Sequence, residues 1–533
     1  MARLTTLSKL LITMLIVGVL AFLIISLTRG GVLDSLLPKE KEKTDLPDGI
    51  MTGNGDNPNG NNGISPKNTN GSGKNSDVVK IGVVTWGGYA AGQYFNEGFL
   101  ANKNSRFYKD YGFEVEFKVL DDFDASRNAW KADEVHLLWA TVDAFPTESA
   151  GLSEFEPQIV FQADWSRGGD AVVARRGINS VDDLRGKKIA VAPMTPSHTF
   201  LLWLMDAGDL KYSEVEIVEV PNAIDAATAF KAGRVDAAVV WSPDDESCVR
   251  DVAGAKVLEN TRTASNIIAD VFFAKKEYIN NNKEKLEKLF EGWMKGAAEL
   301  NGSEANKKKA AKILAEGLNI PEGDALGAMN NVRLCTYGDN VNFFNLEGGY
   351  KGVTGEVLYS KMSTVYNSLN FAPDNVPNWR LVNYPGLVKS TKLSGAQHAA
   401  EGAKTFTAPT TKAKTAPALS TKQVRINYRT GEFQLDENAK YIIDKEFTDI
   451  AKMFANARIR IEGNTDNVGS VSSNKALSLK RAQSVADYLS DEYKMPQNRF
   501  VIVGNGPDNP VADNGTAKGK AKNRRTEFKL IRD

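Results

Sequence analysis

Short runs of apolar residues alternate with amphipathic segments along residues 78–240 of the chain. The runs are too short for helices and rich in valine, alanine and isoleucine, which favours strands buried on both faces. The amphipathic segments between them place apolar residues at helical spacing. We therefore predict a parallel α/β sheet, followed by a mainly helical stretch. The predicted strands are 78–85, 115–120, 135–140, 158–163, 187–192, 216–220 and 236–240, and the predicted helices are 197–207, 224–232, 282–300, 306–318 and 355–369.

A second alternating pattern begins near residue 421 and predicts a small α+β domain at 421–533, with a sheet packed against two helices. Polar stretches precede each folded region. Residues 29–77 are rich in glycine and asparagine, and residues 391–420 in alanine, threonine and lysine. We expect a disordered linker in the first and a tether in the second, which leaves 78–390 as the larger domain. The strands predicted after residue 421 are 424–428, 458–462, 500–503 and 527–531, and the helices are 438–456 and 474–493.

An apolar run near the start of the chain, residues 10–27, contains few polar residues. As a helix this run spans about 27 Å, close to the thickness of a bilayer core. A cleaved signal peptide is the competing interpretation, but its apolar core is shorter and is followed by a small-x-small cleavage site. The segment Ser26-Leu27-Thr28 fits such a site poorly. We predict an uncleaved transmembrane signal anchor at 10–28, after a cytoplasmic stub at 1–9.

The charge balance is even, with 66 lysines and arginines against 66 aspartates and glutamates. No overall positive field draws the chain to nucleic acid, so no nucleic-acid partner is predicted. The chain has two cysteines and three histidines and lacks an HExxH helix, so we predict no metal site and no cofactor. Cys248 and Cys335 are either a disulfide or two buried thiols.

Ligands of open α/β sheets bind beyond the carboxyl ends of the strands. Ser197 and His198 open a predicted helix there, and the free N–H groups and dipole of a helix start favour an anion. Two plainer interpretations stand beside this one. Ser197 or Thr195 only caps the helix, and the tryptophans pack in the core. The residues at the predicted strand ends are Trp86, Gly87, Tyr89, Trp165, Thr195, Ser197, His198 and Trp241.

Several stretches of the larger domain are similar to a known family. Residues 180–191, 232–243 and 268–273 resemble the nitrate/sulfonate/taurine-type periplasmic solute-binding proteins of ABC transporters. The resemblance implies a type II-like bilobal periplasmic-binding-protein fold, with two α/β lobes that close on a ligand about a hinge. It also implies a small anion, a sulfonate or a related metabolite as the ligand. The family places six of the residues above at the cleft: Trp86, Gly87, Tyr89, Ser197, His198 and Trp241.

The same resemblance sets the lobe boundaries, with lobe one at 78–175 and 265–390 and lobe two at 176–264. Asp143, Asp164 and Asp244 then lie near the expected cleft, where they suit an amine or a hydroxylated ligand better than a bare anion.

Some members of the family build pyrimidine vitamin precursors with a histidine as reactant, and His198 is the only candidate for that role here. No neighbouring carboxylate or cysteine in the sequence forms a recognisable dyad with it. We therefore predict no catalytic residue and no enzyme activity.

The predicted helix 474–493 carries polar residues on its apolar side. Arg481 and Asn474 lie within an arc of leucine, valine and alanine side chains. A buried charge requires a partner, and Asp466, in the loop after strand 458–462, is the natural one. An arginine that only snorkels or pairs with a core carboxylate is the plainer interpretation. A neighbouring aspartate and arginine also suit a zwitterion, because they bind its ammonium and its carboxylate.

These segments resemble the OmpA-like peptidoglycan-binding domains over nearly all of 421–533. In that family an aspartate and an arginine hold the diaminopimelate of the peptide stem. The resemblance implies these roles for Asp466 and Arg481, with Asn474, Leu477 and Arg525 supporting the pocket. The matching motifs are Gly463-Asn464-Thr465-Asp466, Asn474, Leu477-Ser478, Arg481-Ala482, Gly504-Asn505-Gly506 and Asn523-Arg524-Arg525-Thr526-Glu527.

Together these expectations describe a single-pass protein of the cell inner membrane with both folded regions in the periplasm. It binds a small-molecule ligand in its cleft and attaches non-covalently to peptidoglycan, with a membrane transporter or sensor as a further partner. The alternative is a structural tether between membrane and cell wall, resembling a motor stator in layout, in which the solute-binding fold serves protein interaction. The apolar run at 10–27 has no intramembrane carboxylate, which disfavours an ion-driven motor.

Overall fold

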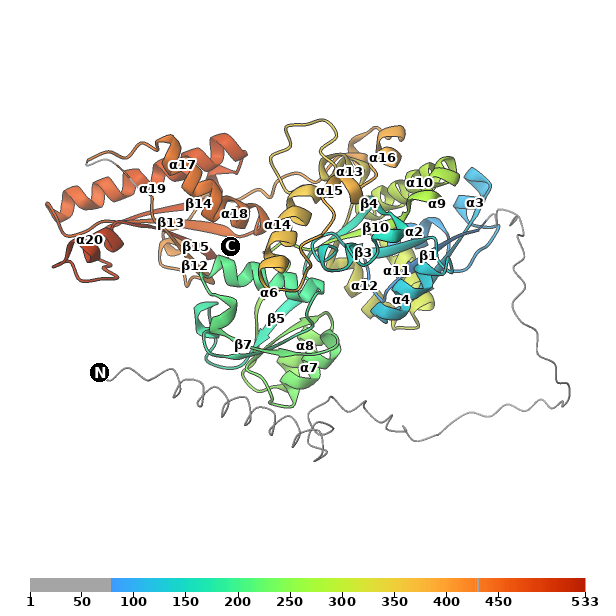
Figure 1. Cartoon of the computed structure of the whole chain (residues 1–533), viewed down its shortest axis with the longest axis horizontal. Helices are drawn as coiled ribbons and strands as arrows, with labels where there is room; N and C mark the ends of the chain where they lie inside the picture. The colour runs from blue at the N-terminus through green and yellow to red at the C-terminus, as the bar shows by residue number, and fades with distance from the viewer. Residues whose placement is uncertain (1–77, 427, 429–430, 533) are drawn as a thin grey trace, which may run out of the picture. The chain divides into compact units, whose positions relative to one another are not determined.

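The computed structural model describes residues 78–426, 428 and 431–532 (Figure 1). The predicted signal anchor at 10–28 and the predicted linker at 29–77 lie outside these residues. None of the helices in the described part combines the length and the apolar composition that a membrane crossing requires. We call residues 78–390 the two-sheet region and residues 421–532 the C-terminal region.

The first sheet of the two-sheet region has six strands in the order β11-β4-β10-β3-β1-β2. The strands β3, β1 and β2, at one side of the sheet, run parallel, as predicted, because helices connect them on the faces of the sheet. β10 runs antiparallel to both of its neighbours, so the sheet is mixed. The strands are β1 (Val78–Val83), β2 (Glu114–Val119), β3 (Leu137–Thr141), β4 (Pro157–Ser166), β10 (Ala269–Lys275) and β11 (Val332–Leu334).

Helices from distant parts of the chain cover this sheet. Figure 1 shows early elements (blue) and later helices (yellow and orange) combined in one lobe. Trp293 of α10 is completely buried against Phe161 and Phe272 of the sheet, with ring centroids 5.2 and 5.0 Å away. The helices are α2 (Ala90–Phe95), α3 (Arg106–Tyr111), α4 (Phe123–Lys131), α5 (Pro146–Ser149), α9 (Lys276–Asn281), α10 (Lys283–Gly302), α11 (Glu304–Leu318), α12 (Glu322–Asn330), α13 (Tyr337–Phe343), α14 (Gly355–Ser368), α15 (Trp379–Val382) and α16 (Gly386–Ser390).

The second sheet has five strands in the order β7-β6-β8-β5-β9, with β6 parallel to β7 and β8. Two of its helices, α6 and α7, start within one residue of the predicted starts, whereas α8 was not predicted. Asn222 caps α7 by accepting from the N–H of Asp225. The elements are β5 (Asp170–Ala174), β6 (Lys188–Val191), α6 (Pro196–Ala207), β7 (Glu216–Glu219), α7 (Ala223–Lys231), β8 (Ala237–Trp241), α8 (Asp244–Asp251) and β9 (Lys256–Asn260).

The boundary between the lobes is corrected by the strand pairing. We predicted that lobe one extends to residue 175, but β5 pairs antiparallel with β8 and β9 in the second sheet. The apolar sequence of β5 is buried there as the fourth strand of that sheet. The chain therefore crosses to the second sheet between Ser166 and Asp170, and it returns between Asn260 and Ala269.

Thr261 connects the two crossing segments. Its hydroxyl accepts a hydrogen bond of 2.8 Å from the N–H of Gly168 and lies 2.8 Å from the hydroxyl of Ser166. These buried bonds hold the ends of β4, β5 and β9 together. As a result, polar residues at the start of β5 and β10 come to the junction of the two sheets.

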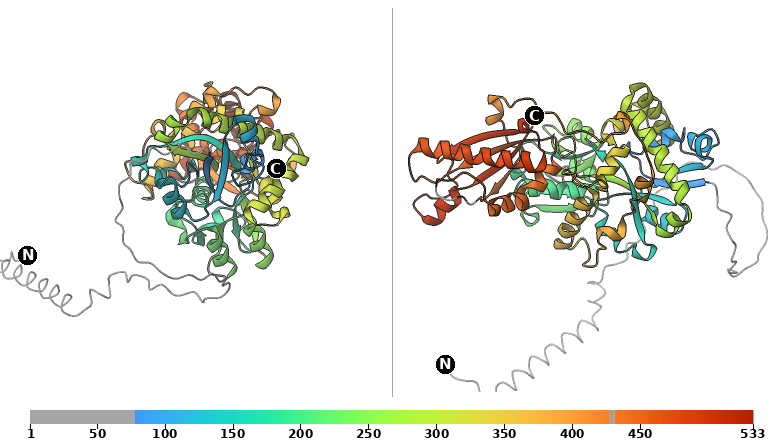
Figure 2. Two further views of the ribbon diagram at one scale, coloured as in Figure 1. Left: turned by 90° about the vertical axis from the view of Figure 1, so that its right-hand side faces the viewer. Right: turned by 90° about the horizontal axis from the view of Figure 1, so that it is seen from above.

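The C-terminal region is a four-stranded sheet in the order β12-β15-β13-β14, with the long helix α19 along it. Figure 2 shows α19, in orange-red, running beside the strands. Gly463 and Gly504 allow this close packing, because a Cβ atom would lie 2.2 Å from Ser478 O or 2.6 Å from Leu479 N. The elements are β12 (Ser420–Val424), α17 (Glu437–Ile443), α18 (Asp449–Met453), β13 (Arg458–Asn464), α19 (Val471–Tyr493), β14 (Phe500–Gly506), α20 (Ala517–Asn523) and β15 (Thr526–Ile531).

Two predictions for this region are corrected. The first strand ends at Val424, where we predicted its start, because Ser420–Val424 pairs with β15. The predicted helix 438–456 is divided by a π-helical turn at Asp444–Thr448.

The segment 391–419 is irregular, as a tether would be, but much of it is packed. Phe406 is buried, and the guanidinium of Arg460 donates to the carbonyls of Ala413 and Ala416. Arg458 donates to the carbonyl of Thr407. Two arginines of β13 thus hold this segment to the sheet, which the sequence composition alone did not indicate.

Cys248 and Cys335 are both buried free thiols. Of the two possibilities left by the sequence, the structure shows the thiols. Burial raises the pKa of each thiol above its usual value, so both are protonated and unreactive at neutral pH.

Candidate functional site

A small cavity lies at the junction of the two sheets. Its volume is about 30 Å³, enough for one or two water molecules. Residues of both sheets line it, from the ends of β1, β3 and β8 and from the starts of β5, β10 and α6. They are Val84, Thr85, Trp86, Trp139, Thr141, Asp170, Pro196, Trp241, Ile268 and Asp270. A cavity bounded by two lobes is where a bilobal fold encloses a ligand, so we call it the cleft cavity.

The aromatic residues of the cleft cavity come from both lobes. Trp86 and Trp139 follow or belong to strands of the first sheet, and Trp241 ends β8 of the second. Trp86 also packs over the crossing segment, because a Cβ atom at Gly169 would lie 2.1 Å from its ring. Near the cavity Asn331 donates a hydrogen bond of 3.0 Å to the hydroxyl of Ser242, which joins the lobes. The two lobes are therefore in contact beside the cavity.

Four aspartates with buried side chains lie at or near the cleft cavity: Asp170 and Asp270 line it, and Asp143 and Asp164 bond to residues beside it. Each accepts a hydrogen bond from a different donor. Tyr89 donates to Asp270 at 2.5 Å, Ser166 to Asp170 at 2.7 Å, Trp86 to Asp164 at 3.4 Å and the N–H of Ala269 to Asp143 at 3.3 Å. These bonds use part of the acceptor capacity of each carboxylate.

Burial raises the pKa of all four carboxyl groups. The pKa is about 7 for Asp143 and Asp170 and about 8 for Asp164. For Asp270 burial and the neighbouring Asp164 charge raise the pKa well above its usual value. Desolvation and mutual repulsion both disfavour the ionised form, so these four carboxyl groups lose protons more readily when a positive charge enters.

Four of the predicted cleft residues lie at this junction. Trp86 and Trp241 line the cavity, and Tyr89 and Asp143 are buried beside it. Gly87 lies against α12, where a Cβ atom would be 2.4 Å from the carbonyl carbon of Ala328. Its contribution is thus close packing of the turn that presents Trp86.

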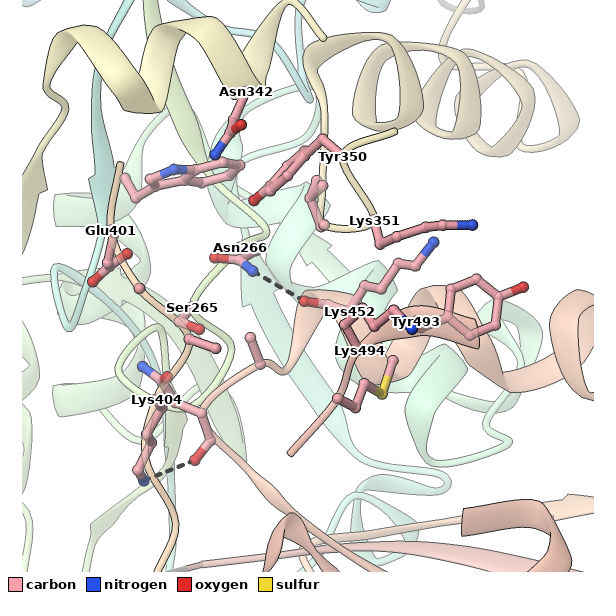
Figure 3. A pocket seen from close by; sticks show the side chains of 18 of the residues that line it. Ser265, Asn266, Asn342, Tyr350, Lys351, Glu401, Lys404, Lys452, Tyr493 and Lys494 are labelled. Atoms are coloured by element: carbon pink, nitrogen blue, oxygen red, sulfur yellow. Dashed lines mark hydrogen bonds between the residues drawn. The ribbon is translucent and has the colours of Figure 1, made fainter. Parts of the chain in front are cut away.

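Trp165 is the first of the predicted cleft residues that the structure places elsewhere. Successive residues of a strand point to opposite faces, so Asp164 faces the cleft cavity and Trp165 faces away. Trp165 instead lines a larger pocket of about 610 Å³, which Figure 3 shows with Tyr350, Lys351, Lys452 and other residues. Arg167, Lys351 and Glu401 in this pocket are already paired, with Glu492 as the partner of Lys351.

His198 lies in an aromatic cluster instead of the cleft cavity. Its ring packs against Tyr212, Tyr366 and Phe371, with centroids 4.7 to 5.6 Å away, and its Nδ1 atom accepts from the N–H of Met194. Burial lowers the pKa of His198 to about 4, so the ring is neutral at neutral pH. This environment is that of a core histidine.

Ser197 and Asp244 also differ from the prediction. Thr195 donates to the carbonyl of Ala192 and lines a pocket of about 680 Å³ that adjoins the cleft cavity, as its predicted place in the cleft requires. Ser197 is completely buried at the start of α6 without lining the cavity. Asp244 lies on the outside of α8, 3.9 Å from the ammonium of Lys231. Its neighbour Asp245 is the buried one, and its charge acts on Asp170.

Sequence reasoning missed Asp170, Asp270, Trp139 and Thr141. Asp170 and Asp270 lie at the starts of antiparallel strands, whereas ligand sites of open α/β sheets are expected at the carboxyl ends of parallel strands. The available signal was a single aspartate at the beginning of an otherwise apolar run, as in Asp170-Ala-Val-Val-Ala. A charged residue on a strand buried on both faces requires a partner or a ligand.

The predicted site of the C-terminal region lies at the start of α19. Asp466, in the loop after β13, is buried and accepts from the N–H of Val468 at 3.0 Å. Its other oxygen accepts from Arg524 at 2.6 Å. Asn474 donates to the carbonyl of Val468 at 2.9 Å and so fixes the same loop. Arg524 was not among the predicted site residues.

Arg481 lies further along α19 and is half-buried, as its position on the apolar arc predicts. Its Nε atom donates to the carbonyl of Glu432 at 3.0 Å, and its guanidinium lies 4.5 Å from the ring centre of Tyr428. Burial lowers the pKa of Arg481, while the Asp466 carboxylate acts in the opposite direction. Leu477, on the same helix, is half-buried.

The side chain of Arg525 is engaged in contacts inside the C-terminal region. It is buried, and it donates to Glu527 at 2.7 Å and to the carbonyl of Asn509 at 3.0 Å. We predicted that Arg525 supports the pocket. The structure corrects this, because adjacent residues before a strand point in opposite directions and Arg524 is the one that contacts Asp466.

Two family models match this chain. Residues 97–302 match the NMT1/THI5 like family, and residues 427–524 match the OmpA family. The chain thus combines an NMT1/THI5-like region with a C-terminal OmpA region.

The C-terminal OmpA region is 44% identical over 90 residues to the peptidoglycan-binding protein ArfA of Mycobacterium tuberculosis. This match covers 17% of the chain and 27% of ArfA, and the chain likewise covers 31% of outer membrane porin F of Pseudomonas aeruginosa and 27% of Omp38 of Acinetobacter baumannii. The NMT1/THI5-like region is 26% identical over 239 residues to the taurine-binding periplasmic protein of Escherichia coli, covering 43% of the chain and 71% of that protein.

Among solved structures, this chain is similar to the periplasmic aliphatic sulphonate binding protein SsuA of Escherichia coli. The match covers 59% of this chain and 99% of SsuA, with 17% identity and a TM-score of 0.46.

Proposed function

We propose that this protein binds a small solute between its two sheets and attaches to peptidoglycan through its C-terminal OmpA region. The observation that carries the first part is the cleft cavity, where tryptophans and buried carboxylates from both lobes converge. Buried polar groups on the wall of an apolar cavity are typical of a site that is completed by a ligand. The similarity to the taurine-binding periplasmic protein supports a solute of that size.

The second part rests on Asp466, in the loop before α19, and on Arg481, near the middle of that helix. The Asp466 carboxylate acts electrostatically on Arg481, and an acidic and a basic side chain so related suit a ligand with an ammonium and a carboxylate. The name of ArfA, a peptidoglycan-binding protein, supports the cell wall as the source of that ligand. The stem residue diaminopimelate has this double charge.

Peptidoglycan binding requires that both folded regions lie in the periplasm. The apolar run at 10–27 then acts as an inner-membrane anchor with a cytoplasmic amino terminus. In this arrangement the protein holds a solute-binding module between the membrane and the wall. A membrane transporter or sensor is the partner that would use the bound solute.

Two measurements test the proposal. Purified full-length protein is incubated with sacculi and sedimented, and binding to the pellet is expected. Thermal unfolding is then recorded with a panel of periplasmic solutes, and at least one is expected to raise the melting temperature. Absence from the pellet would refute wall attachment, and a panel without any shift would favour a scaffold over a solute-binding module.

A further inference from the structure

The cleft cavity is bordered by more negative groups than positive ones. Four aspartates there have buried side chains: Asp143, Asp164, Asp170 and Asp270. Each of them either raises the pKa of another of the four or has its own pKa raised by one. Among the described residues none of the four has an ion pair with lysine or arginine. Buried carboxylates without a counter-charge are costly to the fold.

Two basic side chains near the cleft cavity are engaged with other acids. Arg127 forms two hydrogen bonds with Glu148, at 2.7 and 2.8 Å, and its guanidinium lies 5.1 Å from the ring centre of Trp139. Arg167 is paired with Glu401 at 2.6 Å and lowers the pKa of Asp164, but the pKa of that carboxyl group still stays near 8. A cationic group of a ligand would supply the charge that lets the aspartates ionise.

A second observation points to a ligand independently of the acids. The hydroxyl of Thr141 lines the cleft cavity, the residue is only 4% exposed, and its oxygen has no hydrogen-bond partner. A buried hydroxyl without a partner is uncommon in folded proteins. Trp86, Trp139 and Trp241 border the same space, and indole rings attract cations.

We propose that the cleft binds a small solute with a protonated amine, whose ammonium group lies among Asp170, Asp270 and Thr141 and beside the tryptophans. This inference rests on the proposed solute-binding function and names the class of ligand. An ammonium has three donors, which match two carboxylates and one hydroxyl. A bare anion at the same place would add a negative charge to four aspartates.

The cleft cavity holds only part of an organic amine. Its volume of about 30 Å³ accommodates an ammonium group, and the rest of the solute fits the adjoining pocket of about 680 Å³, which shares Trp139, Thr141 and Pro196 with it. Trp139 borders both spaces, and Trp86 packs over Gly169 at the cleft cavity. Tryptophan fluorescence is therefore a direct readout of ligand entry.

Three probes of similar size separate the charges: taurine, with an amine and a sulfonate; ethanolamine, with the amine only; and ethanesulfonate, with the sulfonate only. Binding to the full-length protein is measured by titration calorimetry and tryptophan fluorescence. We expect taurine and ethanolamine to bind and ethanesulfonate to bind at least tenfold more weakly. Ethanesulfonate binding as tightly as taurine would overturn the amine proposal and leave the solute-binding function standing. If neither these three probes nor 1,4-diaminobutane binds, the amine proposal is overturned as well.

A matched pair of variants locates the amine. Asp170→Asn keeps the shape of the side chain and removes its charge, so we expect about a tenfold or greater loss of affinity for the amines. Asp244→Asn removes the same charge from the outside of α8, 3.9 Å from Lys231, and is expected to bind as the parent does. Equal affinity of both variants would contradict the proposed position. A cooperative thermal transition verifies that the Asp170→Asn variant is folded.

Discussion

The hydroxyl of Tyr89 donates a hydrogen bond of 2.5 Å to Asp270, and both side chains are buried. Tyr89 precedes α2, in the turn after β1, whereas Asp270 lies near the start of β10 in the middle of the first sheet. The bond therefore fixes the turn that carries Trp86 to one of the aspartates of the cleft cavity. Through this single contact, the position of an aromatic wall and the orientation of a carboxylate depend on each other.

Replacement of Tyr89 by phenylalanine removes the donor and keeps the ring. Because the hydrogen bond lowers the pKa of Asp270, its loss leaves the carboxyl group protonated more of the time. We expect the affinity for taurine to fall by about tenfold. Tyr212→Phe, which removes a buried hydroxyl from the aromatic cluster around His198, is the control and should bind as before. Unchanged binding by Tyr89→Phe would argue against a role for Asp270.

Asp170→Asn is expected to stabilise the ligand-free protein, by about 1–3 kcal/mol at pH 8. Burial raises the pKa of Asp170 to about 7 in the fold, whereas in the unfolded chain it is near 4. Between these values the folded state holds the proton and the unfolded state has lost it, so stability falls as the pH rises. The variant does not titrate at this position, and its advantage in melting temperature should grow from pH 5 to pH 8.

The carboxylates that face Asp170, namely Asp164, Asp245 and Asp270, titrate in both proteins. The comparison is therefore made between variant and parent at each pH. A constant difference in melting temperature would show that Asp170 is ionised in the fold throughout this range.

Gly88→Ala is expected to abolish solute binding. A Cβ atom at this position would lie 1.7 Å from Oδ2 of Asp164 and 2.8 Å from Nε1 of Trp86, so both side chains must move. The matched control is Gly327→Ala in α12, where a Cβ atom meets nothing within 4 Å and helix propensity improves. Calorimetric titration with taurine distinguishes the two, and normal binding by Gly88→Ala would place the ligand away from Asp164.

Asp466→Ala and Arg481→Ala are each expected to remove the protein from sedimented sacculi while the melting temperature changes little. The pair Asp466–Arg524 is partly exposed on the arginine side, with half of that side chain accessible, so its loss costs about 1 kcal/mol or less. Lys480→Ala, on the exposed side of α19, serves as the control. Retention of either variant on sacculi would contradict the assignment of the pocket.

Arg525→Ala should behave differently from Arg481→Ala. Arg525 and Glu527 form a buried ion pair, and Lys529 also contacts Glu527 at 3.1 Å, so removal of Arg525 weakens the charge balance and costs about 1–3 kcal/mol. We expect the C-terminal region of the variant to have a lower melting temperature. Sacculus binding should be lost only above that melting temperature. Sacculus binding that is lost at low temperature, with an unchanged transition, would return Arg525 to the binding site.

Local patterns were sufficient for most elements of the fold. The apolar runs of β1, β6 and β8 and the amphipathic pattern of α19 carry their own signal, since burial on two faces or along one stripe leaves a periodic record in the sequence. The half-buried position of Arg481 was predicted for the same reason. The assignment of β5 to the second sheet was not, because nothing in the run Asp170–Ala174 states which strand it pairs with.

The amino-acid sequence by itself determined that two α/β regions follow an apolar run, and which helix of the C-terminal region carries a charge on its apolar side. Only the tertiary structure decided which acids face the cleft cavity, that Trp165 and His198 lie elsewhere, and that Arg524 contacts Asp466. The physical reason is that periodicity records burial, which each residue experiences on its own. Proximity between Asp170 and Asp270, a hundred residues apart in the chain, arises only when antiparallel strands of two sheets start at one junction.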